Sequence, residues 1–184
     1  MPTAFQLRQA RDTIHAGGVV AYPTEAVFGL GCDPENEDAV QKILKLKQRD
    51  WRKGLILIAA TVDQIRPWIN LPQEALAPIS AYWPGPVTWV VPASAGAPDW
   101  ITGGRKEIAV RITAHPVAAA LAATFGGALV STSANPAASP PARGPLTVRH
   151  YFGQHLDLIM SGEVNHGAQP TPIRHWRTGE WLRS

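Results

Sequence analysis

Cysteine is almost absent from this chain of 184 residues, which contains only Cys32. A single thiol cannot form an internal disulfide, so we expect a reducing compartment and a cytoplasmic protein. No neighbouring base would activate Cys32, and the expected role is that of a small buried side chain. The first residues, Met1–Arg8, contain no apolar signal core, and no stretch approaches membrane-spanning length.

Common ligand-binding motifs are missing as well. The chain has no G-x-x-x-x-G-K-[ST] loop, and no G-x-G-x-x-G follows an expected strand. Its six histidines are scattered, with no H-x-x-x-H pair and no cysteine companions. A zinc site built by the protein is therefore not expected.

The composition that is present is typical of a folded globular protein, with 45% hydrophobic and 17% charged residues. Lysine and arginine outnumber aspartate and glutamate by 17 to 14, a mild surplus that fits anionic ligands from ATP to RNA. The length supports one core, and no composition shift marks a boundary, so we expect a single domain over residues 1–184.

Apolar periodicity predicts helices that alternate with short buried strands. Helices are expected at residues 3–16, from the cap Asn36 onward, and at 62–68, 72–82, 115–125 and 146–152. Strands are expected at 19–22, 55–60, 87–91, 108–112, 129–130, 156–160 and near the C-terminus. The remaining long segments, 24–34, 93–104 and 137–145, are expected to be loops. The predicted class is α/β, a twisted mixed β-sheet with flanking helices.

A basic segment ends the helix that follows Asn36. Residues 42–53 contain six cationic residues and one acidic residue, Asp50. Such a run is ordinarily a solvated helix face. Here part of it is expected to lie past the helix and to lead into a buried strand, which places Lys47 and Arg49 on one side near the sheet rim. Phosphate binding and a solvated face both remain open, and Trp51 is equally suited to covering an adenine or anchoring a loop.

A second polar segment, Ser131–Asn135, follows the apolar run that ends at Val130. In an extended chain Ser131, Ser133 and Asn135 point one way and offer a row of donors and acceptors. The alternative is a turn in which the hydroxyls satisfy their own backbone. With the basic segment, this row predicts a nucleotide site at strand ends.

Six motifs resemble those of the YrdC/TsaC family, in the family's order. They are Tyr22–Pro34, Lys47–Arg49, Lys53–Ala59, Trp83–Thr88, Val110–Ile112 and Ser131–Asn135. The resemblance runs from about Gly17 to Gly179, and the short length is similar to the bacterial TsaC branch. Two departures stand out: Asp50 follows the Lys-x-Arg motif where many members have proline, and Pro170-Thr171 replaces a typical Pro-Ser pair.

The resemblance implies L-threonylcarbamoyladenylate synthase activity. Such an enzyme converts L-threonine, bicarbonate or CO2, and ATP to threonylcarbamoyl-AMP and pyrophosphate, for the threonylcarbamoyladenosine (t6A) modification of tRNA. It also implies a concave, positively charged cavity and Mg2+ that accompanies ATP, with no metal site of the protein's own. Downstream t6A-modification proteins are expected as partners, a direct tRNA contact is left open, and no membrane is expected.

The same resemblance assigns roles to single residues. The family signature falls on Lys47, Arg49, Ser133 and Asn135, the expected catalytic and ATP-binding set. The two cations would hold the triphosphate and neutralise charge at the α-phosphorus, while the hydroxyl and the amide would bind phosphate or carbamate oxygens. The further expected nucleotide contacts are Lys53 and Arg143. The expected threonine contacts are Thr24, Arg111, Ser131 and Thr171, and the Arg111 guanidinium is suited to a carboxylate.

Two other hypotheses compete with this one. An RNA-binding or ribosome-maturation factor would use the same basic surplus, but the sequence lacks RNA-binding signatures and an aromatic-rich sheet motif. A pseudoenzyme that keeps only the fold is disfavoured because all four signature residues are present.

Overall fold

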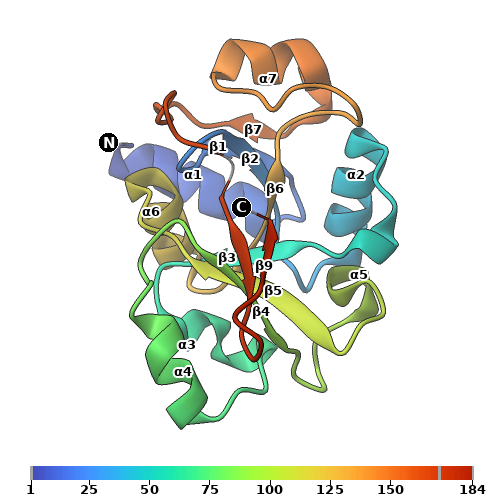
Figure 1. The fold of residues 1–184 in the computed structure, drawn as a ribbon. Helices are drawn as coiled ribbons and strands as arrows, with labels where there is room; N and C mark the ends of the chain where they lie inside the picture. Colours follow the sequence, from blue (N-terminus) through green and yellow to red (C-terminus); the bar gives the residue numbers. More distant parts are fainter. Residues whose placement is uncertain (1, 170, 184) are drawn as a thin grey trace.

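The computed structural model describes residues 2–169 and 171–183. Within these ranges the chain forms a nine-stranded sheet with the strand order β7-β1-β2-β6-β3-β5-β4-β8-β9 (Figure 1). The strands are β1 (Val20–Pro23), β2 (Phe28–Gly31), β3 (Ile56–Ala59), β4 (Thr88–Pro92), β5 (Glu107–Ile112), β6 (Leu129–Ser133), β7 (Leu158–Ile159), β8 (Ile173–His175) and β9 (Trp181–Arg183).

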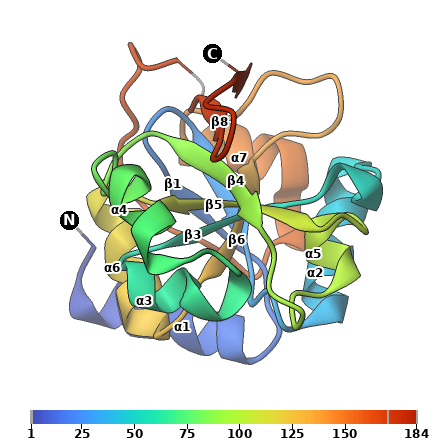
Figure 2. The ribbon, with the colours of Figure 1, turned by 60° about the horizontal axis from the view of Figure 1, so that its bottom comes forward.

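Helices surround this sheet (Figures 1 and 2). They are α1 (Ala4–His15), α2 (Glu37–Lys47), α3 (Val62–Ile65), α4 (Gln73–Ser80), α5 (Asp99–Thr102), α6 (Pro116–Phe125) and α7 (Pro145–Phe152). Short 3-10 turns lie at η1 (Trp51–Lys53), η2 (Arg66–Trp68) and η3 (Gly153–His155). Of these described helices, none combines the length and the apolar character of a membrane span.

The sheet mixes parallel and antiparallel pairs. β3 runs parallel to β5 and antiparallel to β6, while β4 runs antiparallel to β5 and parallel to β8. The pair of β8 and β9 is an antiparallel hairpin at the edge. The sequence-based prediction of a twisted mixed sheet with flanking helices is therefore confirmed.

Both faces of the central strands are covered, as their continuous apolar runs indicate. Along β1, Val20 and Tyr22 belong to one core cluster, and Ala21 belongs to the other. Because side chains alternate along a strand, these clusters lie on opposite faces. α1 and α6 contribute to the Val20 cluster, and α2 contributes to the Ala21 cluster.

Two of the segments expected to be loops contain regular structure. Residues 28–31 form β2, which pairs with β1 and β6, and residues 99–102 form the short helix α5. Glycine made β2 hard to predict, since glycine usually weakens a strand. Here it permits close packing: a Cβ at Gly31 would lie 2.6 Å from both Tyr22 Cε1 and the Val130 carbonyl oxygen.

The end of α2 also differs from expectation. Asn36 caps the helix, as predicted, by accepting a 2.9 Å hydrogen bond from the Ala39 N–H. The helix continues through Lys47, and Gln48 ends it in the left-handed region at φ 50°. Lys47 is thus a helical residue and not part of an extended segment, so the predicted alternation of Lys47 with Arg49 is wrong.

Candidate functional site

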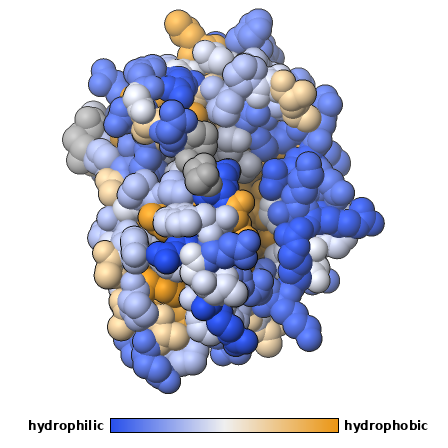
Figure 3. All heavy atoms as spheres, viewed as in Figure 1, coloured by the Kyte–Doolittle hydropathy of each residue, from blue (hydrophilic) through white to orange (hydrophobic). Residues whose placement is uncertain are grey.

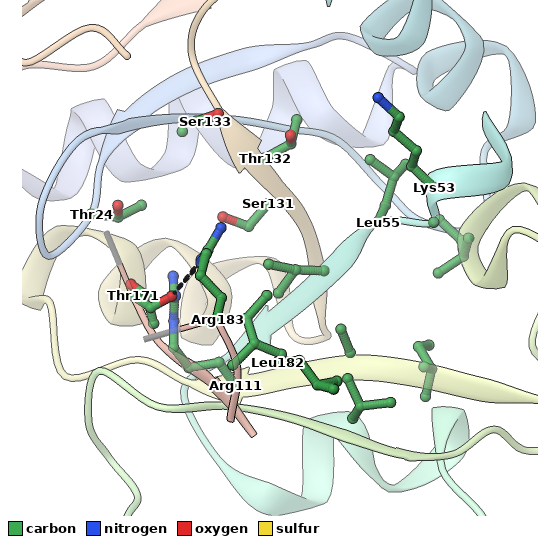
Figure 4. Close-up of a pocket in the computed structure, with 18 of the residues that line it drawn as sticks. Thr24, Lys53, Leu55, Arg111, Ser131, Thr132, Ser133, Thr171, Leu182 and Arg183 are labelled. Carbon is green, nitrogen blue, oxygen red and sulfur yellow. Dashed lines mark hydrogen bonds between the residues drawn. The ribbon is translucent and has the colours of Figure 1, made fainter. Parts of the chain in front are cut away.

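A cavity of about 530 Å³ opens where β2, β6, β3, β5 and the β8–β9 hairpin approach one another (Figure 4). Five of its lining residues are cationic: Arg49, Lys53, Arg105, Arg111 and Arg183. Among the residues that the structure describes, Glu107 is the only acidic residue that lines the cavity. The surface in Figure 3 is largely hydrophilic, with small apolar patches near its centre, at its lower left and at its top. A cavity with this charge favours an anionic ligand.

The cationic residues form two groups, which we call the Arg111 end and the Arg49 end. Arg111 and Arg183 lie together near Thr24, Thr171 and Ser131, as Figure 4 shows. The Arg49 end contains Arg49, Lys53 and Arg105, and Lys53 lies apart from the Arg111 end in the same view. The site therefore offers positive charge at two separate places.

Arg111 is held by buried partners. Its Nη2 lies 3.3 Å from Glu25 Oε2, and both side chains are largely buried. Thr113 donates a 2.7 Å hydrogen bond to the other Glu25 oxygen, and Arg111 Nη1 donates to Thr88 Oγ1 at 3.4 Å. The buried Arg111 Nε has no partner among the described residues. A guanidinium fixed in this way retains donor capacity for a ligand.

Glu25 is expected to stabilise the fold through this pair. The change Glu25→Gln leaves the buried Arg111 charge without its carboxylate, which should lower the free energy of unfolding by about 3 kcal/mol. Urea denaturation near neutral pH measures the change, and Glu35→Gln is the exposed control that should have little effect. A Glu25→Gln protein as stable as the control would show that the pair contributes nothing.

Small side chains surround the Arg111 end. Thr24 and Ser131 approach each other across Gly29, where a Cβ would lie 3.3 Å from Thr24 Cγ2 and 3.4 Å from Ser131 Oγ. The Thr24 hydroxyl donates a 2.7 Å hydrogen bond to the Val27 carbonyl. Ser131, Ser133 and Thr171 also line the cavity. The structure thus brings together all four residues predicted to hold threonine, and Ser133, which was predicted to bind phosphate or carbamate oxygens, lines the same cavity.

The Arg49 end is built around η1. Arg49 Nη2 donates to the Gly54 carbonyl at 3.0 Å, while its buried Nε has no partner within the described residues. Arg105 donates to the carbonyls of Arg52 and Lys53, which ties the segment before β5 to η1. Burial first, and then the charge of Arg105, lower the pKa of the Arg49 guanidinium. An anion placed between these cations would relieve their mutual repulsion.

Lys47 and Asn135 meet each other but are not among the residues that line this cavity. The buried Lys47 ammonium donates to the carbonyls of Ser133 and Asn135, the latter at 2.9 Å, and lies 3.4 Å from Asn135 Oδ1. The Asn135 amide donates to the Ser139 carbonyl at 2.7 Å. Burial first, and then Arg49, lower the pKa of Lys47 to about 8. Lys47 therefore fixes the segment that carries Ser133.

Two other predicted residues lie outside the lining set. Arg143 is exposed and donates to the His166 carbonyl, so its side chain holds one loop to another. Trp51 is also exposed, and the Arg52 guanidinium lies 5.4 Å from its ring centroid. These contacts do not test whether Arg143 binds ATP or whether Trp51 stacks on adenine. Both roles stay predictions.

Sequence reasoning missed Arg105 and Arg183. Arg105 follows two glycines at the end of an expected loop, and Arg183 lies in a C-terminal segment without a motif. Both reach the cavity only through pairing of strands distant in sequence. Within the described ranges, no group of three or more His, Cys, Asp or Glu side chains is placed to hold a metal ion.

The cavity is lined by residues within the strands, such as Val90 of β4 and Ala109 of β5, and not only by strand ends, where the sequence predicted a site. A mixed α/β sheet with a cationic cavity is suited to anionic small molecules. Comparison with known proteins makes the class specific. Residues 12–184 match the Sua5/YciO/YrdC family model, described as "Telomere recombination". The chain belongs to this family.

Named relatives cover the chain almost completely. The threonylcarbamoyl-AMP synthase of Halorhodospira halophila is 57% identical over 97% of this chain and 94% of its own length. That of Alkalilimnicola ehrlichii is 53% identical over the full length of both. The crystal structure of P. abyssi Sua5 complexed with L-threonine has a TM-score of 0.87 and 32% identity, and covers 95% of this chain. This chain spans about half of P. abyssi Sua5, 52% of its length.

Proposed function

We propose that this protein is an L-threonylcarbamoyladenylate synthase that makes threonylcarbamoyl-AMP and pyrophosphate from L-threonine, bicarbonate or CO2, and ATP. The observation that carries the proposal is a single cavity with two separate cationic ends. The hydroxyl groups of Ser131, Thr132 and Ser133 line the same cavity. A triphosphate and an amino-acid carboxylate are two anions on different substrates, and each requires its own cation. Full-length relatives with this name support the assignment.

The Arg111 end suits L-threonine. Arg111 and the neighbouring hydroxyls of Thr24, Ser131 and Thr171 would bind the carboxylate, the amine and the side-chain hydroxyl. P. abyssi Sua5, a relative of similar fold, has been crystallised with L-threonine. Because cations near an amine disfavour its charged form, this end would also favour the neutral amine that attacks the carbon source.

The Arg49 end suits ATP. Arg49 and Lys53 would hold the triphosphate, which enters as its Mg2+ complex. A carbamate oxygen then attacks the α-phosphorus, the bond to the β-phosphate breaks, and pyrophosphate leaves. Such a step depends on positioning and on cations that meet the developing charge, so no protein nucleophile is needed. Ser133 would donate to phosphate or carbamate oxygens, and Lys47 and Asn135 would support the strand end that carries it. Arg143 would contact the nucleotide from its exposed loop.

The product of this reaction serves t6A modification of tRNA. We accordingly expect the protein to act in the cytoplasm and to pass the labile adenylate to the proteins that modify tRNA. A direct tRNA contact is not required for the chemistry.

The test is a complete reaction with omission controls. Purified protein with ATP, L-threonine and bicarbonate should release pyrophosphate and form an AMP-containing product that mass spectrometry identifies. Leaving out threonine or the carbon source should abolish both signals. Pyrophosphate release that does not depend on threonine, or no release in the complete mixture, would contradict the proposal. In that second case a strongly salt-dependent affinity for RNA would favour an RNA-binding protein.

A further inference from the structure

Thr113 is a buried residue two positions after Arg111, and it does not line the cavity. We propose that Thr113 is a positioning residue for amino-acid binding. Its hydroxyl holds the Glu25 carboxylate in place and so leaves donors of Arg111 free for the carboxylate of the substrate. This inference rests on the proposed function, because it assigns a supporting residue to the threonine-binding end of that same site.

The backbone places Thr113 on the same side of the sheet as Arg111. The Thr113 N–H donates to the Ala59 carbonyl at 3.0 Å, which continues the pairing of β5 with β3 by one residue. Side chains two residues apart in an extended chain point the same way. Glu25, in the turn between β1 and β2, contacts both side chains, and its own carbonyl accepts a 3.0 Å hydrogen bond from the Asn165 N–H. Its carboxylate is therefore shared by Thr113 and Arg111.

The direction of the Thr113 hydroxyl is fixed by its partners. Its oxygen accepts a 3.1 Å hydrogen bond from the N–H of His115, the residue that precedes α6. A backbone N–H can only donate, so the single proton of the hydroxyl goes to its other partner, Glu25 Oε1, at 2.7 Å. The start of a helix thus fixes a donor that is directed at one oxygen of the carboxylate.

The other oxygen of Glu25 leaves part of Arg111 unused. Glu25 Oε2 lies 3.3 Å from Arg111 Nη2 as an ion pair, but makes no hydrogen bond within the described residues. The adjacent Arg111 Nε is likewise buried without a partner there, while Nη1 donates to Thr88. Because Nε and Nη2 form the fork that binds a carboxylate through both of its oxygens, this edge of Arg111 suits the substrate.

Loss of the Thr113 hydroxyl would let Glu25 compete with the substrate. Glu25 Oε1 would then be a buried acceptor without its donor, which is costly. The guanidinium that the carboxylate already faces offers donors at Nε and Nη2, so Glu25 would turn to bind Arg111 through both oxygens. The substrate carboxylate would find the fork occupied. Thr113 therefore acts on the ligand through two other residues without touching it.

The experiment compares Thr113→Val with Thr113→Ser in steady-state pyrophosphate release. Valine keeps the shape and removes the hydroxyl, and should raise the KM for L-threonine about 10-fold, with kcat and the KM for ATP within about twofold. Serine keeps the hydroxyl and should stay near the wild type. Ser80→Ala is the control for a lost hydroxyl: Ser80 donates to the Leu76 carbonyl at 2.9 Å on α4, outside the cavity lining. It should leave both KM values unchanged.

A substrate analogue tests the link to the carboxylate. L-threonine amide lacks the carboxylate charge, so its binding by calorimetry should be weak in the wild type and no weaker in Thr113→Val. An unchanged threonine KM in Thr113→Val, an equal rise in Thr113→Ser, an equal rise in the KM for ATP, or weaker binding of the amide to Thr113→Val would overturn the inference.

Failure of the proposed function would be seen separately, as a wild type that releases no pyrophosphate. Calorimetry with L-threonine alone would then decide the role of Thr113. Weaker binding to Thr113→Val than to the wild type and Thr113→Ser would support it. Equal affinities in the three proteins, or no binding to the wild type, would overturn it.

Discussion

Replacement of Arg49 by alanine should reduce threonylcarbamoyl-AMP formation on the order of 100- to 1000-fold, the cost of losing one donor that meets charge in a transition state. Arg49 lines the cavity, and its Nε is buried without a partner among the described residues. Within the described part of the chain the side chain makes one hydrogen bond, to the Gly54 carbonyl, so the fold should lose only about 1 kcal/mol. Pyrophosphate release and thermal unfolding measure the two effects.

Arg52→Ala is the matched control for this experiment. Arg52 is three residues further along and carries the same charge, but its side chain is 71% exposed and it does not line the cavity. Its activity should stay within about twofold of the wild type, because an exposed ion pair contributes little. Equal losses in the two variants would mean that general basic charge, and not a positioned guanidinium, supports the reaction. Full activity in Arg49→Ala would remove the assignment of Arg49.

Replacement of Lys47 by methionine should destabilise the protein and impair its activity together. The Lys47 ammonium holds the carbonyls of Ser133 and Asn135, and the methionine variant would leave these acceptors without their donor. We expect a loss of about 3 kcal/mol in the free energy of unfolding near neutral pH, measured by urea denaturation. Lys45→Met, an exposed change on the same helix, should leave both properties nearly unchanged.

The stability difference between wild type and Lys47→Met should also depend on pH. Burial lowers the pKa of Lys47 to about 8 in the folded protein, against 10.5 as its ordinary value. Between these values the unfolded chain binds more protons than the folded one, so the stability of the wild type rises with pH relative to the variant, by up to about 1.4 kcal/mol per pH unit. Below that interval the cost of burying the charge is fully present. A difference that is constant or falls from about pH 8 to about pH 10 would show that Lys47 has no lowered pKa.

The sequence predicted the α/β class and most of the elements because their apolar runs are clear. The Asn36 cap and the strand at residues 55–60 follow from local pattern alone. The strand β2 did not, because its two glycines indicate a turn in isolation, and only pairing with β1 and β6 makes a strand favourable there. Local pattern therefore fails where packing between distant strands decides the structure.

The candidate site was predictable to a similar extent. Thr24, Arg111, Ser131 and Thr171 lie together as the motif resemblance implied, although no local rule joins residues so far apart. Lys47 illustrates the opposite case: its spacing from Arg49 indicated a shared direction, but the helix continues through Lys47 and turns its side chain toward Ser133. Arg183 carries no motif, and its position follows only from the pairing of β8 with β4.

The walls of the cavity come from nearly the whole length of the chain, from Thr24 to Arg183. Bringing such distant segments together costs conformational entropy, because each contact closes a long loop. A molecule bound in the cavity therefore contacts parts that only the complete sheet brings together, and it opposes unfolding of all of them at once. Substrate added at a hundred times its dissociation constant should raise the free energy of unfolding by about 2.7 kcal/mol. The occupied enzyme would then resist heat and proteolysis as one cooperative unit.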